Sequence, residues 1–325
     1  LCGLEYRMAP EQTPGIGRKS GAQAPFLVMA AMAIMGGVDA LVPRIAEQSG
    51  LFQFHLLRAA MVLPMIGILA WKMRISLLPR SNGAVFARSC AVGLSMMIYF
   101  GALAVFPVSE VVAGLFTAPI FVLLLTWALP GERVGSGAFV GIALGFVGLL
   151  IVLQPGAADR SPWVVVPVAA GAAYAVGALL TRRVCAQEHV LTLVFWFFGL
   201  MLVSSAVGLV LLEVVPGLSA ETFALRPWSP APEPVFYLYC TLQAVGSLAG
   251  VGLLTQAYKV GSTPVVAGFE YSFMIFAAVW AWLLLGQIPA PHALAGMALI
   301  LVSGIVILRF GTAGVGKSLL DANRP

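Results

Sequence analysis

The sequence predicts an all-α integral membrane protein, with ten transmembrane helices arranged as two inverted five-helix repeats. Three observations support this fold class. Of the 325 residues, 60% are hydrophobic and only 10% are charged, whereas about a quarter of the residues in a soluble domain are charged. Ten apolar runs follow one another with short breaks, and a segment late in the first half recurs late in the second. Lipid is therefore the expected solvent over most of the chain.

The apolar runs approach the length of about 20 residues that a helix needs to cross the hydrocarbon core. The predicted spans are residues 25–43, 53–71, 84–106, 109–129, 134–153, 162–182, 190–214, 235–257, 263–285 and 290–310. Most breaks hold few residues, so neighbouring spans are expected to form antiparallel hairpins. The longest break, residues 215–234, is rich in Pro and is predicted to be a connector without a helix.

The distribution of Lys and Arg predicts the orientation. If the N-terminus is cytoplasmic, every basic residue lies in an inner segment except Arg44, Arg58, Arg160 and Arg226, as the positive-inside rule requires. The expected location is the inner (plasma) membrane, with both tails, residues 1–24 and 312–325, in the cytoplasm. The net charge of +5 then fits membrane lipid as a partner, and no nucleic acid is expected.

Both ends of the chain carry short patterns that have more than one interpretation. The chain begins with Leu1, so Met8 is a candidate start, and a signal peptide near Gly36 is the alternative to a first span. Residues 311–318, GTAGVGKS, match the phosphate-loop pattern, which needs a preceding strand and a following helix. A span precedes this segment and only a short tail follows, so neither nucleotide binding nor a cofactor is predicted.

An internal repeat divides the chain. Residues 131–156, GERVGSGAFVGIALGFVGLLIVLQPG, align without gaps with residues 286–311, GQIPAPHALAGMALILVSGIVILRFG, at an offset of 286 − 131 = 155. Residues 25–156 and 157–311 are therefore predicted to be equivalent repeats. Five spans per repeat is an odd number, so the second repeat enters the bilayer upside down, which is a recurring plan of transporters.

Several segments resemble the EamA type of the drug/metabolite transporter superfamily. They are Ala118-Pro119-Ile120-Phe121 in the fourth span, the following Gly131-Glu132, Glu270-Tyr271-Ser272 in the ninth span, Gly286 at its end, and Arg58 near the start of the second. The resemblance covers nearly all of residues 25–311, although Gln287 stands where many relatives carry Glu. It implies two EamA repeats and metabolite transport, often the export of amino acids or related compounds.

The ninth span carries an ionisable residue, Glu270, which is expensive in lipid and therefore a candidate for function. Its predicted face holds small residues, so we expect it to point inward. There it could bind a substrate ammonium group or accept a proton in coupling; the alternative is a protonated Glu bonded to a neighbouring helix. In the first repeat, Leu115 aligns with Glu270 at the same offset. Pro119 lacks the amide hydrogen that would bond to the Leu115 carbonyl, so this carbonyl could be free; the alternative is that Pro119 only kinks the helix.

Other polar residues inside the spans complete the candidate substrate-binding set. They are Tyr271, Tyr99, Tyr174 and Gln243, with Asp39 near the outer end of the first span. Tyr rings could line a cavity and face a cation; packed tyrosines, and an Asp39 that faces outer water, are the alternatives. Gly137, Gly141, Gly145 and Gly148 form a stripe that indicates close helix packing, with a dimer contact as the alternative.

These features favour a carrier over other classes of protein. The three histidines, His55, His189 and His292, form no catalytic or metal-binding set with their neighbours, so an enzyme is not expected. The predicted function is secondary transport of an amino acid or related amino-bearing solute, with export expected, by alternating access. Uptake of a cationic cofactor such as S-adenosylmethionine is the alternative. Substrate, direction, coupling ion (a proton is one candidate) and oligomeric state stay open.

Overall fold

The computed structural model describes residues 23–102, 108–129, 134–154, 165–230, 233–286 and 288–310. Within these ranges every regular element is an α-helix. The helices are α2 (Ala24–Asp39), α3 (Val42–Gln48), α4 (Leu51–Met73), α5 (Asn82–Ala102), α6 (Val108–Leu115), α7 (Ala118–Ala128), α8 (Ser136–Leu153), α9 (Val165–Arg183), α10 (Val190–Val214), α11 (Pro234–Val260), α12 (Thr263–Glu270), α13 (Ser272–Leu285) and α14 (Pro291–Phe310). The two tails, Gly131-Glu132, Gln287 and the phosphate-loop-like segment lie outside the described residues.

The described helices form ten units that are long and apolar enough to cross a membrane. Three of these units are composite, because α2 continues into α3, α6 into α7, and α12 into α13. The predicted fold class is therefore confirmed. Residues 215–230 contain no helix, as their prolines predict, whereas the first unit extends to Gln48 rather than residue 43. Pro43 is tolerated there because it lies in the first turn of α3, where no helical bond to its nitrogen is needed.

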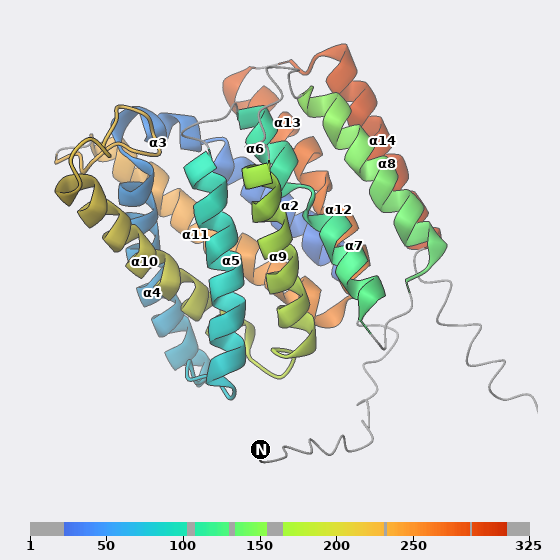
Figure 1. Ribbon diagram of the computed structural model, residues 1–325, viewed down its shortest axis with the longest axis horizontal. Helices are drawn as coiled ribbons and strands as arrows, with labels where there is room; N and C mark the ends of the chain where they lie inside the picture. Colours follow the sequence, from blue (N-terminus) through green and yellow to red (C-terminus); the bar gives the residue numbers. More distant parts are fainter. Residues whose placement is uncertain are drawn as a thin grey trace, which may run out of the picture.

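The chain reverses direction with each unit, so α2 begins and α14 ends at the same end of the bundle (Figure 1). We call this the terminal end, and the opposite one, which carries α3 and residues 215–230, the α3 end. The closest helix pairs join the two predicted repeats: α14 packs along α8, α9 along α5, α11 along α2, and α10 along α4. The space between the repeats is therefore lined by helices of both.

The glycine stripe of α8 lets α14 approach closely. A Cβ atom at Gly148 would lie 2.8 Å from the carbonyl oxygen of Gly296, and one at Gly141 would lie 2.3 Å from a side-chain carbon of Ile307. The same approach allows the Ser303 hydroxyl to donate to the carbonyl of Gly141 at 2.6 Å. The stripe therefore serves packing within the chain, as the sequence indicates.

Two of the composite units break at equivalent positions. α6 ends at Leu115 and α7 begins at Ala118, while α12 ends at Glu270 and α13 begins at Ser272. The break residues Phe116 and Tyr271 are 271 − 116 = 155 positions apart, which is the offset of the sequence repeat. Pro119 explains the first break, because it has no amide hydrogen for the carbonyl of Leu115. No Pro lies at the second break, where the chain instead makes a tight turn from Tyr271 to Met274.

Candidate functional site

A cavity of about 180 Å³ lies between the two repeats, beside both helix breaks. This volume holds several water molecules, each of which needs roughly 10–15 Å³ by such a measure. Its walls are largely apolar and rich in aromatic rings and methionines, namely Phe100, Phe116, Phe197, Phe198, Phe273, Met32, Met35 and Met96. Its polar lining consists of Asp39, Arg58, Tyr99, Tyr174, Ser247 and Glu270. An apolar cavity with few polar groups is typical of a small-molecule site.

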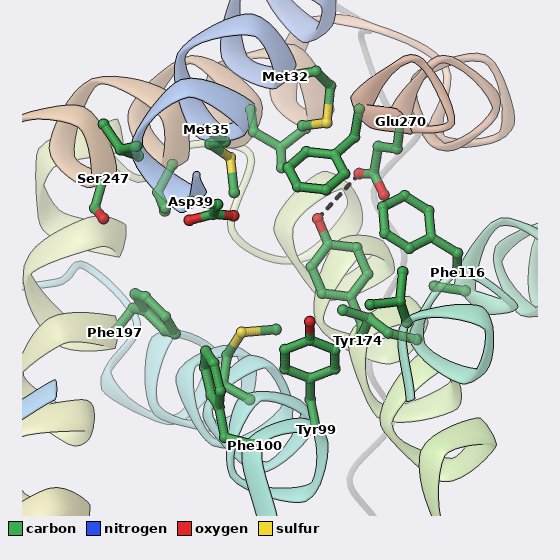
Figure 2. Close-up of a pocket in the computed structure, with 18 of the residues that line it drawn as sticks. Met32, Met35, Asp39, Tyr99, Phe100, Phe116, Tyr174, Phe197, Ser247 and Glu270 are labelled. Atoms are coloured by element: carbon green, nitrogen blue, oxygen red, sulfur yellow. Dashed lines mark hydrogen bonds between the residues drawn. The ribbon is translucent and has the colours of Figure 1, made fainter. Parts of the chain in front are cut away.

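Glu270 is the last residue of α12, so the helix break presents its carboxyl group to the cavity (Figure 2). Its Oε1 atom accepts two hydrogen bonds, from the Tyr174 hydroxyl at 3.0 Å and from the Tyr258 hydroxyl at 2.7 Å. The ion pairs found among the described residues do not include Glu270. A buried acid held by neutral donors can exchange a proton or accept a cation without first breaking an ion pair.

The sequence did not single out Tyr258, which is 3% exposed. It lies near the end of α11, where a Tyr is equally expected in an interfacial belt. The short turn between α11 and α12 brings it back against Glu270, only 12 residues later. That turn was the one available signal, because a hairpin this tight brings the last residues of α11 against the first two turns of the next helix, where Glu270 lies.

Asp39 lines the cavity at the end of α2, on the side nearer the α3 end. Gln243 is fully buried and does not line the cavity; its amide donates to the Val38 carbonyl at 2.7 Å and to the Asp39 carboxylate at 3.3 Å. Gln243 therefore positions Asp39. The contact depends on α11 packing against α2, which is a pairing between the two repeats.

Tyr99, Tyr174 and Pro119 also line the cavity, as does Leu115, the residue equivalent to Glu270 in the first repeat. The Tyr99 hydroxyl points into the open space from α5 (Figure 2). The structure thus brings together Glu270, Tyr174, Tyr99, Asp39 and Pro119 from five helices. Tyr174 also makes the local hydrogen bond to Glu270 that the alternative of packed tyrosines expects, so the substrate-contact role of both tyrosines stays a prediction.

Tyr271 lies elsewhere. It is fully buried and outside the cavity, with its ring against α8, where a Cβ at Gly145 would be 2.5 Å from it. Its hydroxyl is buried without a hydrogen-bond partner. A side chain one position after Glu270 points about 100° away around the helix axis, and here that turn directs Tyr271 toward α8. Tyr271 is therefore removed from the set of candidate substrate contacts.

Arg58 joins the site although the sequence connected it only with the family resemblance. Its guanidinium donates to the Ser247 hydroxyl at 3.4 Å and to Nδ1 of His55 at 2.8 Å. It also lies over the rings of Phe54 and Phe198, at 5.1 and 5.8 Å from their centroids. Arg58 lies two turns from the start of α4, where a long basic side chain could equally extend to the membrane surface. The sequence pattern alone therefore did not place Arg58 in the site.

Polar contacts join the helices on the terminal side of Glu270. Arg88 is 4% exposed and donates to Thr181 of α9 at 3.1 Å, to the Leu193 carbonyl of α10 at 3.1 Å, and to Thr255 of α11 at 3.3 Å. Nearer the surface, Arg182 donates to the carbonyl of Lys259 at 2.6 Å. These bonds hold α5, α9, α10 and α11 together on the terminal side of the cavity.

The described residues contain no group of three or more His, Cys, Asp or Glu side chains that could hold a metal ion. The cysteines described there, Cys90, Cys185 and Cys240, are free. Burial raises the pKa of the Cys185 thiol, which keeps it protonated and inert.

The fold and the cavity define a multi-pass membrane carrier for a small molecule, and comparison with known proteins supports this class. Residues 23–154 match the model of the EamA-like transporter family. The riboflavin transporter of Rhizobium johnstonii is 28% identical over 223 residues, 68% of each chain. The pseudopaline exporter CntI of Pseudomonas aeruginosa is 26% identical over 297 residues, 90% of this chain and 96% of its own.

More distant relatives extend the comparison. An S-adenosylmethionine uptake transporter of Rickettsia prowazekii is 20% identical over 219 residues, 66% of this chain and 69% of its own. A solved crystal structure with 18% identity superposes with a TM-score of 0.72 over 88% of this chain and 96% of that one, which shows the shared fold. The predicted resemblance to the EamA-type transporters of the drug/metabolite transporter superfamily is confirmed.

Proposed function

We propose that this protein is a secondary carrier that exports an amino acid or a related amino-bearing solute by alternating access. The observation that carries the proposal is Glu270, a single carboxyl group at a helix break, held by two tyrosine hydroxyls in a cavity between the repeats. A carboxylate in such surroundings is costly unless it is hydrogen-bonded or paired with a cation. A substrate ammonium group would supply that cation.

Proton coupling follows from the same geometry. In the absence of solute, a proton on Glu270 would remove its charge from the apolar cavity. An arriving ammonium group would displace the proton, and the departing solute would allow a proton to return. Exchange at one carboxyl group links outward movement of the solute to inward movement of a proton. This requires that the solute binds on the inside and leaves on the outside, and that the proton does the reverse.

The equivalent breaks at Phe116 and Tyr271 support alternating access. In carriers built from inverted repeats, exchange of the conformations of the two halves turns an opening on one side into an opening on the other. We assign the Arg88 bonds to closure of the terminal side, while Asp39 and Arg58 line the cavity toward the α3 end. If both termini are in the cytoplasm, as the basic residues predict, this conformation is closed inward.

Uptake of a cationic cofactor is a second candidate. The relatives named as S-adenosylmethionine uptake transporters favour it, and the aromatic lining together with Glu270 suits a cation. Direction separates the two: an exporter confers resistance to a toxic amino-acid analogue on growing cells, whereas an uptake carrier accumulates S-adenosylmethionine in vesicles.

Transport in proteoliposomes tests the role of Glu270. A panel of amino acids, amines and S-adenosylmethionine identifies solutes that the purified protein moves. Glu270→Gln is expected to lower their transport by roughly 10- to 100-fold, since a hydrogen bond or ion pair to a charged group contributes about 1.5–3 kcal/mol.

Glu47→Gln is the matched control, because the Glu47 side chain is 61% exposed on α3, and it is expected to transport at the wild-type rate. If Glu270→Gln moved every solute of the panel as fast as the wild type, the assigned role of Glu270 would be wrong.

A further inference from the structure

The cavity lining contains a basic group, Arg58, on the side opposite Glu270. We propose that Arg58 binds a carboxylate of the transported solute, so that the solute is a zwitterion whose ammonium group faces Glu270. This inference rests on the proposed function and narrows its substrate class. Figure 2 shows Asp39 and Ser247, the neighbours of Arg58, across the open space from Glu270 and Tyr174.

The hydrogen bonds of Arg58 leave room for an anion. A guanidinium carries five N–H donors, and the described partners of Arg58 are two neutral groups, the Ser247 hydroxyl and His55 Nδ1. Its Nε atom is buried without a partner. The ion pairs found among the described residues join Arg44 to Glu47 and Arg226 to Glu221, and neither includes Arg58. A permanently charged group that lines a cavity therefore has donors free.

The surroundings of Arg58 fix the orientation of these donors. Arg can only donate, so Nδ1 of His55 accepts and the ring proton resides on Nε2. The guanidinium also lies over the rings of Phe54 and Phe198, which restrict its movement. A planar group fixed in this way is prearranged for the two parallel hydrogen bonds that a carboxylate accepts.

Asp39 offsets the charge of Arg58 without occupying its donors. The two residues are joined through a chain of neutral bonds: Arg58 donates to Ser247, Ser247 donates to Gln243 at 3.4 Å, and Gln243 donates to Asp39 at 3.3 Å. Among the described residues, Arg58 and Asp39 thus bring opposite charges to the cavity without forming an ion pair. Such an arrangement lowers the cost of keeping Arg58 charged and leaves it able to bind a carboxylate.

The walls between the two ends of the cavity define the rest of the solute. Phe100, Phe197 and Met35 line the space between Glu270 and the Arg58 side (Figure 2). Apolar and aromatic walls favour a solute with a large apolar body. The structure therefore assigns a zwitterion with an apolar or aromatic side chain.

Three solutes that share one ring but differ in charge test this assignment. They are L-phenylalanine (zwitterion), L-phenylalaninamide (cation) and 3-phenylpropanoate (anion), measured as transport by the purified full chain in proteoliposomes. The wild type is expected to prefer L-phenylalanine over its amide. Arg58→Gln is expected to reduce this preference about 10- to 100-fold, because the bonds to the carboxylate are charge-assisted. A general structural defect would slow both solutes and leave their ratio unchanged.

Two further variants keep the experiment decisive. Arg58→Lys retains the charge but not the planar fork, so its preference for L-phenylalanine over the amide should be weaker than that of the wild type and stronger than that of Arg58→Gln. If Arg58→Gln folds poorly, the comparison of Arg58→Lys with the wild type still tests the role of Arg58. Arg44→Gln removes an arginine that is 59% exposed and should keep the wild-type preference.

The outcomes separate this inference from the proposed function. An unchanged preference in Arg58→Gln, or equal transport of L-phenylalanine and its amide by the wild type, overturns the role of Arg58 and leaves Glu270 as the amino-binding group. Transport of 3-phenylpropanoate alone, lost in Arg58→Gln, overturns the amino-bearing substrate and supports Arg58. Transport of none of the three, while another amino-bearing solute of the panel is moved, overturns the assigned substrate class and leaves the proposed function standing.

Discussion

The tyrosines around Glu270 show how single residues set the properties of the cavity. Tyr174 and Tyr258 come from α9 and α11 and donate to the same carboxylate oxygen, so that they orient the group and offset part of the cost of its burial. Tyr271, the next residue along the chain, has a buried hydroxyl without a partner. Tyr174 and Tyr258 therefore stabilise the buried carboxyl group, whereas the Tyr271 hydroxyl destabilises the fold.

This contrast predicts opposite effects of removing a hydroxyl. Tyr258→Phe removes a hydrogen bond to Glu270 and should lower transport about two- to tenfold, for a bond that contributes roughly 0.5–1.5 kcal/mol. Tyr271→Phe should leave transport unchanged and raise the thermal midpoint, because it removes an unsatisfied buried group. Transport assays and fluorescence-detected melting of the purified variants measure both effects. Reduced transport by Tyr271→Phe, or an unaffected Tyr258→Phe, would contradict these roles.

The helices show which parts of the architecture follow from local sequence. Hydrophobic length determined the ten spans, and Pro119 with the repeat offset indicated the first helix break. The second break, at Tyr271, has no local signal, since no Pro or Gly lies there; only its equivalence to Phe116 points to it. Likewise, the buried acid Glu270 was predictable from its cost in lipid. Its partner Tyr258 was not, because that contact depends on how α11 and α12 pack together.

Packing of α8 on α14 predicts a position-specific cost of adding a methyl group. At Gly148 a Cβ would meet the backbone of α14, with the Gly296 carbonyl oxygen at 2.8 Å, whereas nothing lies within 4 Å of a Cβ at Gly199 in α10. Gly148→Ala should therefore lower the thermal midpoint by several degrees, as overpacking costs about 1–3 kcal/mol. Gly199→Ala should keep or raise it, because Ala favours a helix interior over Gly. Equal midpoints for the two variants would argue against the close α8–α14 contact.

At the scale of the whole molecule, the two predicted repeats pair their helices around a shared cavity. Arg88 bonds to three helices on the terminal side of this cavity, whereas Arg58 and Asp39, which are joined through Ser247 and Gln243, lie on the other side. The sequence predicted the inverted plan but not these contacts, since they depend on how helices of the two repeats pack together. Transport by alternating access requires these two sides to open in turn.

Cysteine labelling from each side of the membrane tests this requirement most directly. In a chain with Cys2, Cys90, Cys185 and Cys240 replaced, Ser247→Cys reports on the cavity side, and Thr181→Cys, at a residue 2% exposed beside Arg88, reports on the closed side. A membrane-impermeant reagent should reach the two positions from opposite compartments, and conditions that increase labelling of one should decrease labelling of the other. Labelling of both from the same compartment, or parallel changes at both positions, would contradict alternating access through this cavity.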